Sequence, residues 1–474
     1  MCEIVHFETT GCRLNQIESE SAARFFSEKS FSVSMGGITA KSPVIENAVL
    51  CVVNTCAVTQ KAEQKDRRII RLLLEKCPFA TVLVTGCYAE LSAKKIEEID
   101  SRISSLRGLL KSRVEKIADF LREYLSKRAG VFDAVEFSRL LRDGICAFPI
   151  KKEGVSENPF SLNTESFLSH SRPSIKIQDG CNNSCSYCAI HLARGHSVSL
   201  DAKSVIERVQ TFEKTGHAEV VITSVNIAQY RGAYNDEFVN ITQLLKLLLL
   251  NTEKINIRLS SIYPEVVDAD FCEVIKDKRI RPHFHISVQS GSDDVLFAMK
   301  RHYKAADVLS ACKQLKKAKE HVFLACDIIT GFNGETEEDF EKTLELCKNC
   351  GFSWVHVFPF SERQGTEASL MKGKVPQSVR DERALRLTKW ATSRKIAYIQ
   401  SCIGKEFDAI LEKRKDGFHA VTENFLHCKI SDGILNSIET EQYVSSDFVR
   451  VRITECLKEN AGKGGELDCI AEIL

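Results

Sequence analysis

Apolar and polar positions in the first third of the chain alternate between two periods. Residues 48–56 (AVLCVVNTC) and 80–87 (ATVLVTGC) are continuous apolar runs, which are typical of buried parallel strands. Between them, residues 60–76 (QKAEQKDRRIIRLLLEK) repeat apolar positions at helical spacing and carry many charges. This alternation predicts an N-terminal α/β domain with a parallel sheet over residues 1–135.

A second series of strands and helices is predicted from residue 172. The segments 204–216 and 305–318 have helical spacing, and 336–351 opens on the capping residue Thr336. Six strand–helix units predict a (β/α)6 partial TIM barrel over 172–400, smaller than the eight-unit form. The candidate strands are residues 173–179, 218–225, 255–261, 283–289, 322–330 and 354–360.

Two further segments have their own patterns. Residues 136–171 are rich in Ser, Asn, Glu and Pro, which is typical of a linker. Residues 401–474 lack a long helical pattern, and their short β-like runs predict a small C-terminal β-barrel. These runs are 407–413, 417–423, 425–430 and 448–455.

Composition narrows the class of protein. A chain of 474 residues with 43% hydrophobic and 27% charged residues is ordinary for a protein of several globular domains. The N-terminus has no apolar h-region, and the most apolar run, LLKLLLL at 244–250, is too short to span a bilayer. We therefore expect a cytoplasmic protein with no membrane partner.

Nineteen cysteines are many for an intracellular chain and indicate metal or redox chemistry rather than disulfides. Cys272, Cys312 and Cys347 lie in apolar, helix-like segments, where a thiol usually serves as a small hydrophobic residue. Residues 180–188 (GCNNSCSYC) differ, because they place Cys181, Cys185 and Cys188 in a C-x3-C-x2-C spacing just past the first barrel strand.

Three thiolates leave two interpretations of that stretch. Structural zinc would need a remote fourth ligand and is usually built from C-x2-4-C pairs. A cubane iron–sulfur cluster takes one thiolate per iron, so three cysteines would leave one iron open for a ligand. A second set, Cys12, Cys56 and Cys87, has matching contexts (TTGCRLNQ, VVNTCAVT, LVTGCYAE), and a parallel sheet would bring its members to one edge. Buried thiols are the alternative to a second cluster.

Nine stretches match the motifs of one enzyme family in chain order. They are GCRLNQIESE, NTCAVT, TGCYAE, GCNNSCSYC, ITSVNIAQY, RLSSIYPE, HFHISVQSGSDDVLFAMKRHY, DIITGFNGETEEDF and HVFPFSERQGTEA. They resemble the radical S-adenosylmethionine (SAM) methylthiotransferases, with an N-terminal methylthiotransferase domain, a radical SAM core and a TRAM-like C-terminal domain. TSVNIAQY, SSIYP and HVFPFSERQGT most resemble the MtaB branch, which modifies N6-threonylcarbamoyladenosine in tRNA.

The resemblance implies a transferase with two [4Fe-4S] clusters that acts beside the anticodon, in the anticodon stem-loop of tRNA. Cys181, Cys185 and Cys188 would hold the cluster that cleaves SAM, and Cys12, Cys56 and Cys87 an auxiliary cluster carrying the sulfur. A radical from SAM would remove hydrogen from C2 of the adenine. Such an enzyme needs an electron donor, such as flavodoxin or ferredoxin, and a sulfur donor.

Further residues are candidates for SAM or substrate contacts, with a purely structural polar role as the alternative for each. Tyr187 precedes the last cluster cysteine and could pack against the cluster or the SAM adenine. The other candidates, on or just past the barrel strands, are Ser224, Asn226, Arg258, Ser260, Gln289 and Asp327.

Some positions depart from the family pattern. Asn333 replaces a usual proline in GFNGETEEDF, and only Arg194 and Gly195 clearly fit the family after the cluster stretch. The tail from 401 has nine Lys or Arg against fourteen Asp or Glu, although RNA binding usually depends on neutralising phosphates. The eight Lys or Arg within 370–400 could supply that charge or could form a solvated helix face.

Three functions remain open from the sequence. The first is a tRNA methylthiotransferase of the MtaB type. The second keeps the chemistry but acts on isopentenyladenosine in tRNA (the MiaB branch) or on a ribosomal protein (the RimO branch). The third is a non-catalytic iron–sulfur RNA-binding protein.

Overall fold

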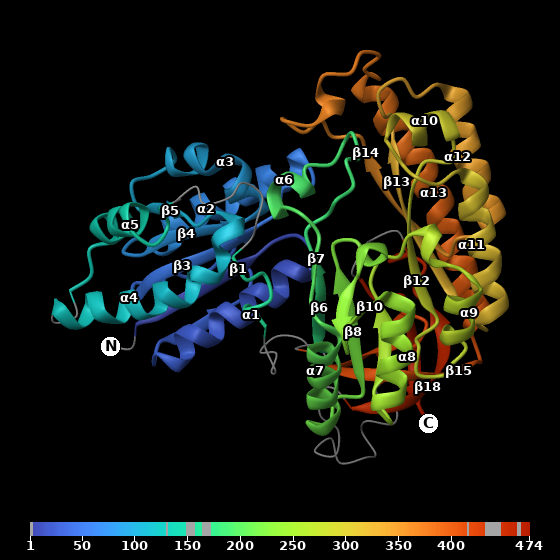
Figure 1. Ribbon diagram of the computed structural model, residues 1–474, viewed down its shortest axis with the longest axis horizontal. Helices are drawn as coiled ribbons and strands as arrows, with labels where there is room; N and C mark the ends of the chain where they lie inside the picture. The colour runs from blue at the N-terminus through green and yellow to red at the C-terminus, as the bar shows by residue number, and fades with distance from the viewer. Residues whose placement is uncertain are drawn as a thin grey trace. The chain divides into compact units, whose positions relative to one another are not determined.

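The computed structural model describes residues 3–128, 131–147, 157–163, 172–414, 417–431, 447–461 and 466–474 (Figure 1). The chain forms two compact units. Unit 1 contains Met1–Ser169, Gln178–Val198 and Glu362–Thr366, and unit 2 contains His170–Ile177, Ser199–Ser361 and Glu367–Leu474. The stretch 180–188 therefore belongs to the same unit as Cys12, Cys56 and Cys87.

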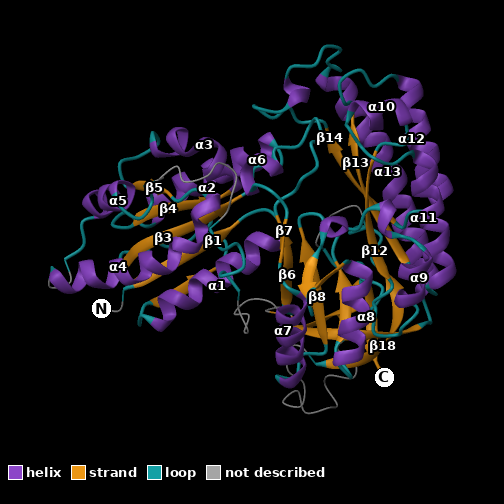
Figure 2. Ribbon diagram, viewed as in Figure 1, coloured by secondary structure: helices purple, strands orange, loops and turns teal. Residues whose placement is uncertain are grey.

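Unit 1 is built on a parallel sheet with the strand order β2-β1-β3-β4-β5 (Figure 2). Strands β3 and β4 confirm the predicted apolar strands, whereas the other three strands were not predicted. The direction of winding changes between β1 and β3, and at such a switch point the carboxyl ends of the strands leave a crevice suited to a ligand. The strands are β1 (Ile4–Thr9), β2 (Ser32–Met35), β3 (Ala48–Thr55), β4 (Thr81–Gly86) and β5 (Ile103–Ser105).

Helices cover both faces of this sheet. Side chains of α1, α4 and α5 share one buried cluster with it, and those of α2 and α3 share another. Helix α2 coincides with the predicted helix 60–76. The helices are α1 (Arg13–Glu28), α2 (Gln60–Lys76), α3 (Cys87–Glu97), α4 (Val114–Lys127) and α5 (Ala134–Asp143), with a 3-10 turn at Gly108–Arg113.

Helix α5 corrects the interpretation of residues 136–171 as a linker. Phe137 and Leu141 are fully buried in the core of unit 1, and Asp133 caps the helix by accepting hydrogen bonds from its first turn. The polar composition of the segment hid this amphipathic helix, so its first part belongs to the folded domain. Residues 148–156 and 164–171 of the predicted linker lie outside the described residues.

The core of unit 2 consists of parallel strands in the orders β11-β8-β6-β7 and β12-β13-β14. Isolated parallel bridges from Ile257 to Ile280 and from Ile262 to Ile286 join the two sheets. Six of these strands lie at the predicted positions, which confirms the partial-barrel prediction. They are β6 (Ser174–Asp179), β8 (Glu219–Ser224), β11 (Asn256–Leu259), β12 (His283–Gln289), β13 (Phe323–Thr330) and β14 (Trp354–Pro359).

Helices follow these strands, as Figure 2 shows for the right-hand part of the view. They are α7 (Ala202–Lys214), α8 (Ile241–Asn251), α9 (Ala269–Ile275), α10 (Asp293–Ala298), α11 (Ala305–Ala318), α12 (Glu337–Cys350) and α13 (Gln377–Cys402). Short strands β7 (Val198–Ser199), β9 (Gly232–Tyr234) and β10 (Glu237–Val239) and the 3-10 turns Ile227–Gln229, Pro264–Val266 and Glu367–Ser369 complete the core.

The C-terminal segment forms a closed barrel in the order β15-β16-β17-β19-β18, which confirms the predicted β-barrel. The last strand was missed, because its five residues follow a Gly- and Glu-rich stretch. The strands are β15 (Glu406–Arg414), β16 (Gly417–Thr422), β17 (His427–Ile430), β18 (Phe448–Cys456) and β19 (Cys469–Ile473).

A buried ion cluster joins the barrel to the amino-terminal half of the core strands. Glu219, at the start of β8, accepts hydrogen bonds from Arg258 at 2.7 Å and from Arg281 at 2.9 Å. Arg258 also donates to the carbonyl oxygens of Thr422 and Glu423 in the barrel. Burial acts to raise the pKa of Glu219, but the surrounding guanidiniums outweigh it and lower that pKa to about 2.

Replacing Glu219 by Gln should therefore destabilise unit 2 by about 3–5 kcal/mol near neutral pH, because it leaves buried guanidiniums without their counter-ion. Since the folded pKa lies below the ordinary value of 4.5, this contribution is present above about pH 4.5 and is lost as the pH falls through about 2. Thermal unfolding of both proteins at pH 7 and pH 3 measures it.

The matched control is Glu157→Gln, which breaks a half-exposed pair with Arg113 and should shift the unfolding midpoint little. Equal shifts for the two variants at pH 7 would contradict the role given to Glu219.

Candidate functional site

Three cysteines distant in sequence gather at the carboxyl edge of the unit 1 sheet. Cys12 precedes α1 after β1, Cys56 directly follows β3, and Cys87 begins α3 directly after β4. Burial raises the pKa of the Cys56 thiol to about 12, and the nearby thiols of Cys87 and Cys12 act in the same direction. Cys56 and Cys87 are buried, whereas Cys12 is exposed, so the set opens to solvent on one side.

Two glycines allow these loops to approach one another. Gly11 has a φ of +87°, and a Cβ there would lie 2.6 Å from the Cβ of Cys56. Gly86 has a φ of +92°, and a Cβ there would lie 2.4 Å from the carbonyl oxygen of Thr55. No other residue type combines that backbone conformation with such close contact.

The stretch 180–188 leaves β6 as a loop and ends before the short helix α6 (Ile190–Arg194). Backbone N–H groups of Asn183 and Ile190 donate to the sulfurs of Cys181 and Cys188, each at 3.4 Å. Such bonds favour thiolates, the form that binds iron, so this donor set fits an iron–sulfur cluster. Cys185 is buried and Tyr187 is half-buried.

The six cysteines lie on loops, and their arrangement differs from that of a site for a single metal ion. In the described part of the chain, no three His, Cys, Asp or Glu side chains are arranged to hold a single metal ion. A cubane cluster spreads its ligands differently, because each thiolate bonds a separate iron.

Two serines predicted to contact SAM have hydroxyl groups without a hydrogen-bond partner among the described residues. Ser224 ends β8 and Ser260 follows β11, and among the described residues their buried Oγ atoms have no hydrogen-bond partner. Buried hydroxyls are normally paired, so these two positions fit a polar ligand such as SAM at the strand ends.

Comparison with known proteins identifies the family. The radical SAM superfamily model matches residues 175–347, and the model described as "Uncharacterized protein family UPF0004" matches residues 4–108. The threonylcarbamoyladenosine tRNA methylthiotransferase MtaB of Treponema pallidum (strain Nichols) is 42% identical, covering 90% of this chain and 94% of that protein. The chain belongs to the radical SAM methylthiotransferase family.

Two other relatives extend the comparison. The MtaB protein of Thermotoga maritima is 33% identical over 99% of this chain and 98% of that protein. A tRNA-2-methylthio-N(6)-dimethylallyladenosine synthase from Caldicellulosiruptor saccharolyticus is 28% identical over 95% of this chain and 90% of that protein.

Membership of the radical SAM family implies that SAM and a [4Fe-4S] cluster are cofactors of the protein. Within the described ranges, no helix of this methylthiotransferase is long and apolar enough to cross a membrane.

The other residues of the methylthiotransferase that are predicted to contact SAM differ from one another in their structural environment. Asn226 caps the turn after β8 by accepting from the N–H of Ala228, and Gln289 ends β12 with a φ of +72°. Arg258 is buried, and the contacts described above join it to Glu219 and the barrel, which is a structural role. Its contact with SAM, like those of the other candidates, stays a prediction.

Asp327 lies on β13 beside histidines of the two neighbouring strands. Its Oδ2 is 2.9 Å from Nε2 of His285 on β12, and His285 stacks on His356 of β14. Burial acts to raise the pKa of Asp327, but His285 outweighs it and the pKa is lowered. Burial lowers the pKa of His356 to about 4, so near pH 7 the imidazole of His356 is neutral and the carboxyl group of Asp327 is ionised.

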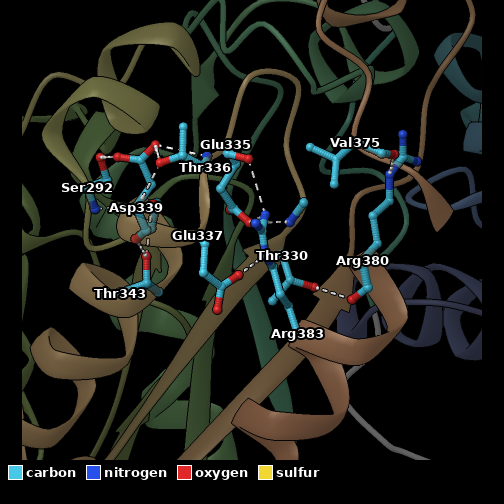
Figure 3. Close-up of polar contacts among 12 residues, drawn as sticks. Ser292, Thr330, Glu335, Thr336, Glu337, Asp339, Thr343, Val375, Arg380 and Arg383 are labelled. Atoms are coloured by element: carbon cyan, nitrogen blue, oxygen red, sulfur yellow. Dashed lines mark hydrogen bonds and ion pairs between the residues drawn. The ribbon is translucent and has the colours of Figure 1, made fainter. Parts of the chain in front are cut away.

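The loop after β13 is fixed by helix α13 (Figure 3). Arg383 donates to Glu335 at 2.7 Å, and Glu335 accepts from the N–H of Gly331. Asn333 donates to the carbonyl oxygen of Ala368 at 2.7 Å, a bond that the usual proline could not make. The departure at Asn333 therefore anchors the loop. Three of the eight basic residues of 370–400, Arg383, Arg386 and Lys395, form ion pairs with acidic side chains. These three do not contribute free positive charge for RNA.

The polar groups that hold the cysteine loops were not predicted from the sequence. Asp66 on α2 is buried, accepts from the N–H of Cys56 at 3.0 Å and accepts from the hydroxyl of Thr10 at 2.7 Å. Asn15, inside the quoted motif GCRLNQIESE, donates to the carbonyls of Thr10 and Thr55. Asp66 shares the buried face of α2 with Ile70 and Leu73, and this polar residue on an apolar face was a signal that could have revealed it.

Gly180 offers a test of the cluster loop. It has a φ of +71°, and a Cβ there would lie 2.0 Å from the carbonyl oxygen of His196. Gly180→Ala should therefore displace the loop and reduce the iron bound after anaerobic reconstitution several-fold, as measured by iron analysis and absorbance.

The control is Gly216→Ala, because Gly216 has a similar φ of +87° but open space around it. That variant should bind iron as the wild type does, at a cost of about 1 kcal/mol in stability. Normal iron binding by Gly180→Ala would show that the close approach is unimportant.

Proposed function

We propose that this protein is a two-cluster radical SAM methylthiotransferase that inserts a methylthio group at C2 of N6-threonylcarbamoyladenosine, beside the anticodon of tRNA. The observation that carries the proposal is the gathering of Cys12, Cys56 and Cys87 at one sheet edge, in the unit that also contains 180–188. Three thiolates in each set would leave an open iron in each cluster.

Each set of three cysteines would have its own role in the reaction. Cys181, Cys185 and Cys188 would hold the cluster with which SAM supplies a carbon-centred radical for removing the C2 hydrogen. That hydrogen is not acidic, so no positioned base could remove it near neutral pH. Cys12, Cys56 and Cys87 would hold the cluster that carries the sulfur. Ser224, Asn226, Ser260, Gln289 and Asp327 would orient SAM and the substrate.

The relatives support the choice of substrate. The Treponema relative named for threonylcarbamoyladenosine is 42% identical, whereas the Caldicellulosiruptor relative named for dimethylallyladenosine is 28% identical. We infer that tRNA is the substrate, and that an electron donor such as flavodoxin or ferredoxin and a sulfur donor serve the enzyme.

Cysteine variants separate the two predicted clusters. Cys185→Ala should abolish formation of 5′-deoxyadenosine from SAM, because it removes a ligand of the SAM-cleaving cluster. Cys56→Ala should keep that activity within a few-fold but stop methylthiolation. The measurement is liquid chromatography of both products from anaerobically reconstituted, reduced protein.

Cys146→Ala is the control, since Cys146 is a buried cysteine of unit 1 outside both sets, and it should leave both products unchanged. Methylthiolated tRNA from Cys56→Ala would disprove the auxiliary assignment.

Nucleoside analysis of tRNA tests the substrate. A deletion strain should lose 2-methylthio-N6-threonylcarbamoyladenosine, and the gene for the wild-type chain should restore it, whereas Cys185→Ala should not. Loss of the methylthiolated isopentenyladenosine instead would assign the MiaB-type substrate. If the purified protein contains intact clusters yet forms no 5′-deoxyadenosine, the non-catalytic RNA-binding alternative is correct.

A further inference from the structure

Four charged side chains are buried together in unit 1: Glu18 on α1, Lys111, Asp179 at the end of β6, and Arg194 on α6. Nη1 of Arg194 lies 2.9 Å from Oδ1 of Asp179 and 3.1 Å from Oε1 of Glu18. Nζ of Lys111 lies 3.0 Å from Oδ2 of Asp179 and also pairs with Glu18. Two positive and two negative charges balance, as buried ions require.

This network closes the loop that carries Cys181, Cys185 and Cys188. Oδ1 of Asp179 accepts from the N–H of Gly180 at 2.9 Å. The N–H of Cys181 donates to the carbonyl oxygen of Gly195 at 3.0 Å, directly beside Arg194. The amino-terminal end of the loop is therefore held at two points, by Asp179, which pairs with Arg194, and by the residue that follows Arg194.

The same guanidinium reaches the other cysteine set. Nη2 of Arg194 donates to Oδ1 of Asn15 at 2.7 Å. Nδ2 of Asn15 donates to the carbonyl oxygens of Thr10 at 2.9 Å and Thr55 at 3.0 Å. Thr10 lies two residues before Cys12, and Thr55 directly precedes Cys56. Both groups are at least nine-tenths buried, at 6% exposure for Arg194 and 1% for Asn15.

We propose that Arg194 and Asn15 are positioning residues that fix the Cys181–Cys188 loop against the loops of Cys12 and Cys56. This rests on the proposed function insofar as the two sets hold two clusters. The bonds run without interruption from Gly180 through Asp179, Arg194 and Asn15 to Thr55. The planar fork of the guanidinium places one nitrogen on the carboxylates and the other on the amide, which a lysine ammonium would not reproduce.

The fixed arrangement matters because transfer between two centres depends on their separation. A radical made at one site and a sulfur held at another must both meet the same adenine carbon, and small misplacements cost large factors in rate. Loosening this brace should therefore uncouple SAM cleavage from sulfur insertion rather than stop cleavage.

Hydrogen exchange measured by mass spectrometry on the apoprotein tests the brace without any cofactor. In Arg194→Gln, amides at 10–13 and 55–58 should exchange about tenfold faster, together with those at 180–195. Arg194→Lys should show the same change, because it keeps the charge but not the fork. Asn15→Ala leaves the four charges paired and should raise the exchange rates of the amides at 10–13 and 55–58. This variant tests the same brace if the Arg194 variants fold poorly.

Arg113→Gln is the control, since it removes an arginine of unit 1 that bonds Glu157 and lies outside this network. It should leave exchange at all three segments as in the wild type. If Arg194→Gln changes only 180–195, or Asn15→Ala changes neither segment, the brace does not exist.

The reconstituted enzyme supplies a second readout. Asn15→Ala should raise the ratio of 5′-deoxyadenosine to methylthiolated tRNA at least about tenfold over the wild type. An unchanged ratio would overturn the positioning role. If the wild type makes no methylthiolated tRNA while the exchange results hold, the proposed function fails but the brace stands.

Discussion

Parallel strands put all their carboxyl ends at one edge of a sheet, and this constraint governs unit 1. Cys12, Cys56 and Cys87 lie far apart in the sequence, yet each follows one of three neighbouring strands, β1, β3 and β4. Glycines with left-handed backbone conformations precede Cys12 and Cys87, which lets the loops pack more closely than side chains would allow. The fold thus places three thiols at one edge of the sheet.

Buried ion pairs hold the cysteine loops of unit 1 in place. Arg194 and Lys111 sit opposite Glu18 and Asp179, and Glu219 sits among arginines in unit 2. Such clusters add little net stability over apolar packing, but removing one member is costly, so they specify geometry. In unit 1 that geometry concerns the cysteine loops, and in unit 2 it joins the partial barrel to the C-terminal barrel.

The sequence predicted elements whose signal is local. Continuous apolar runs revealed β3, β4 and the six barrel strands, whereas β1 was missed because His6 and Glu8 interrupt its apolar residues. Helix α5 was hidden by a polar composition. The cysteines were recognised from spacing and context, but Asn15 and Asp66 were not, because only the fold brings them to the loop groups that they bind. The basic stretch 370–400 was equally ambiguous, since only the fold shows that Arg383 and Arg386 pair with acidic residues of α12.

Whether each cysteine set holds its own [4Fe-4S] cluster can be decided by Mössbauer spectroscopy and iron analysis of ⁵⁷Fe-reconstituted protein. The wild type should contain about eight irons per chain, and about four should remain after all three of Cys12, Cys56 and Cys87 are changed to Ala. A wild-type protein with about four irons, or a triple variant that retains all of them, would contradict the assignment of one cluster to each set.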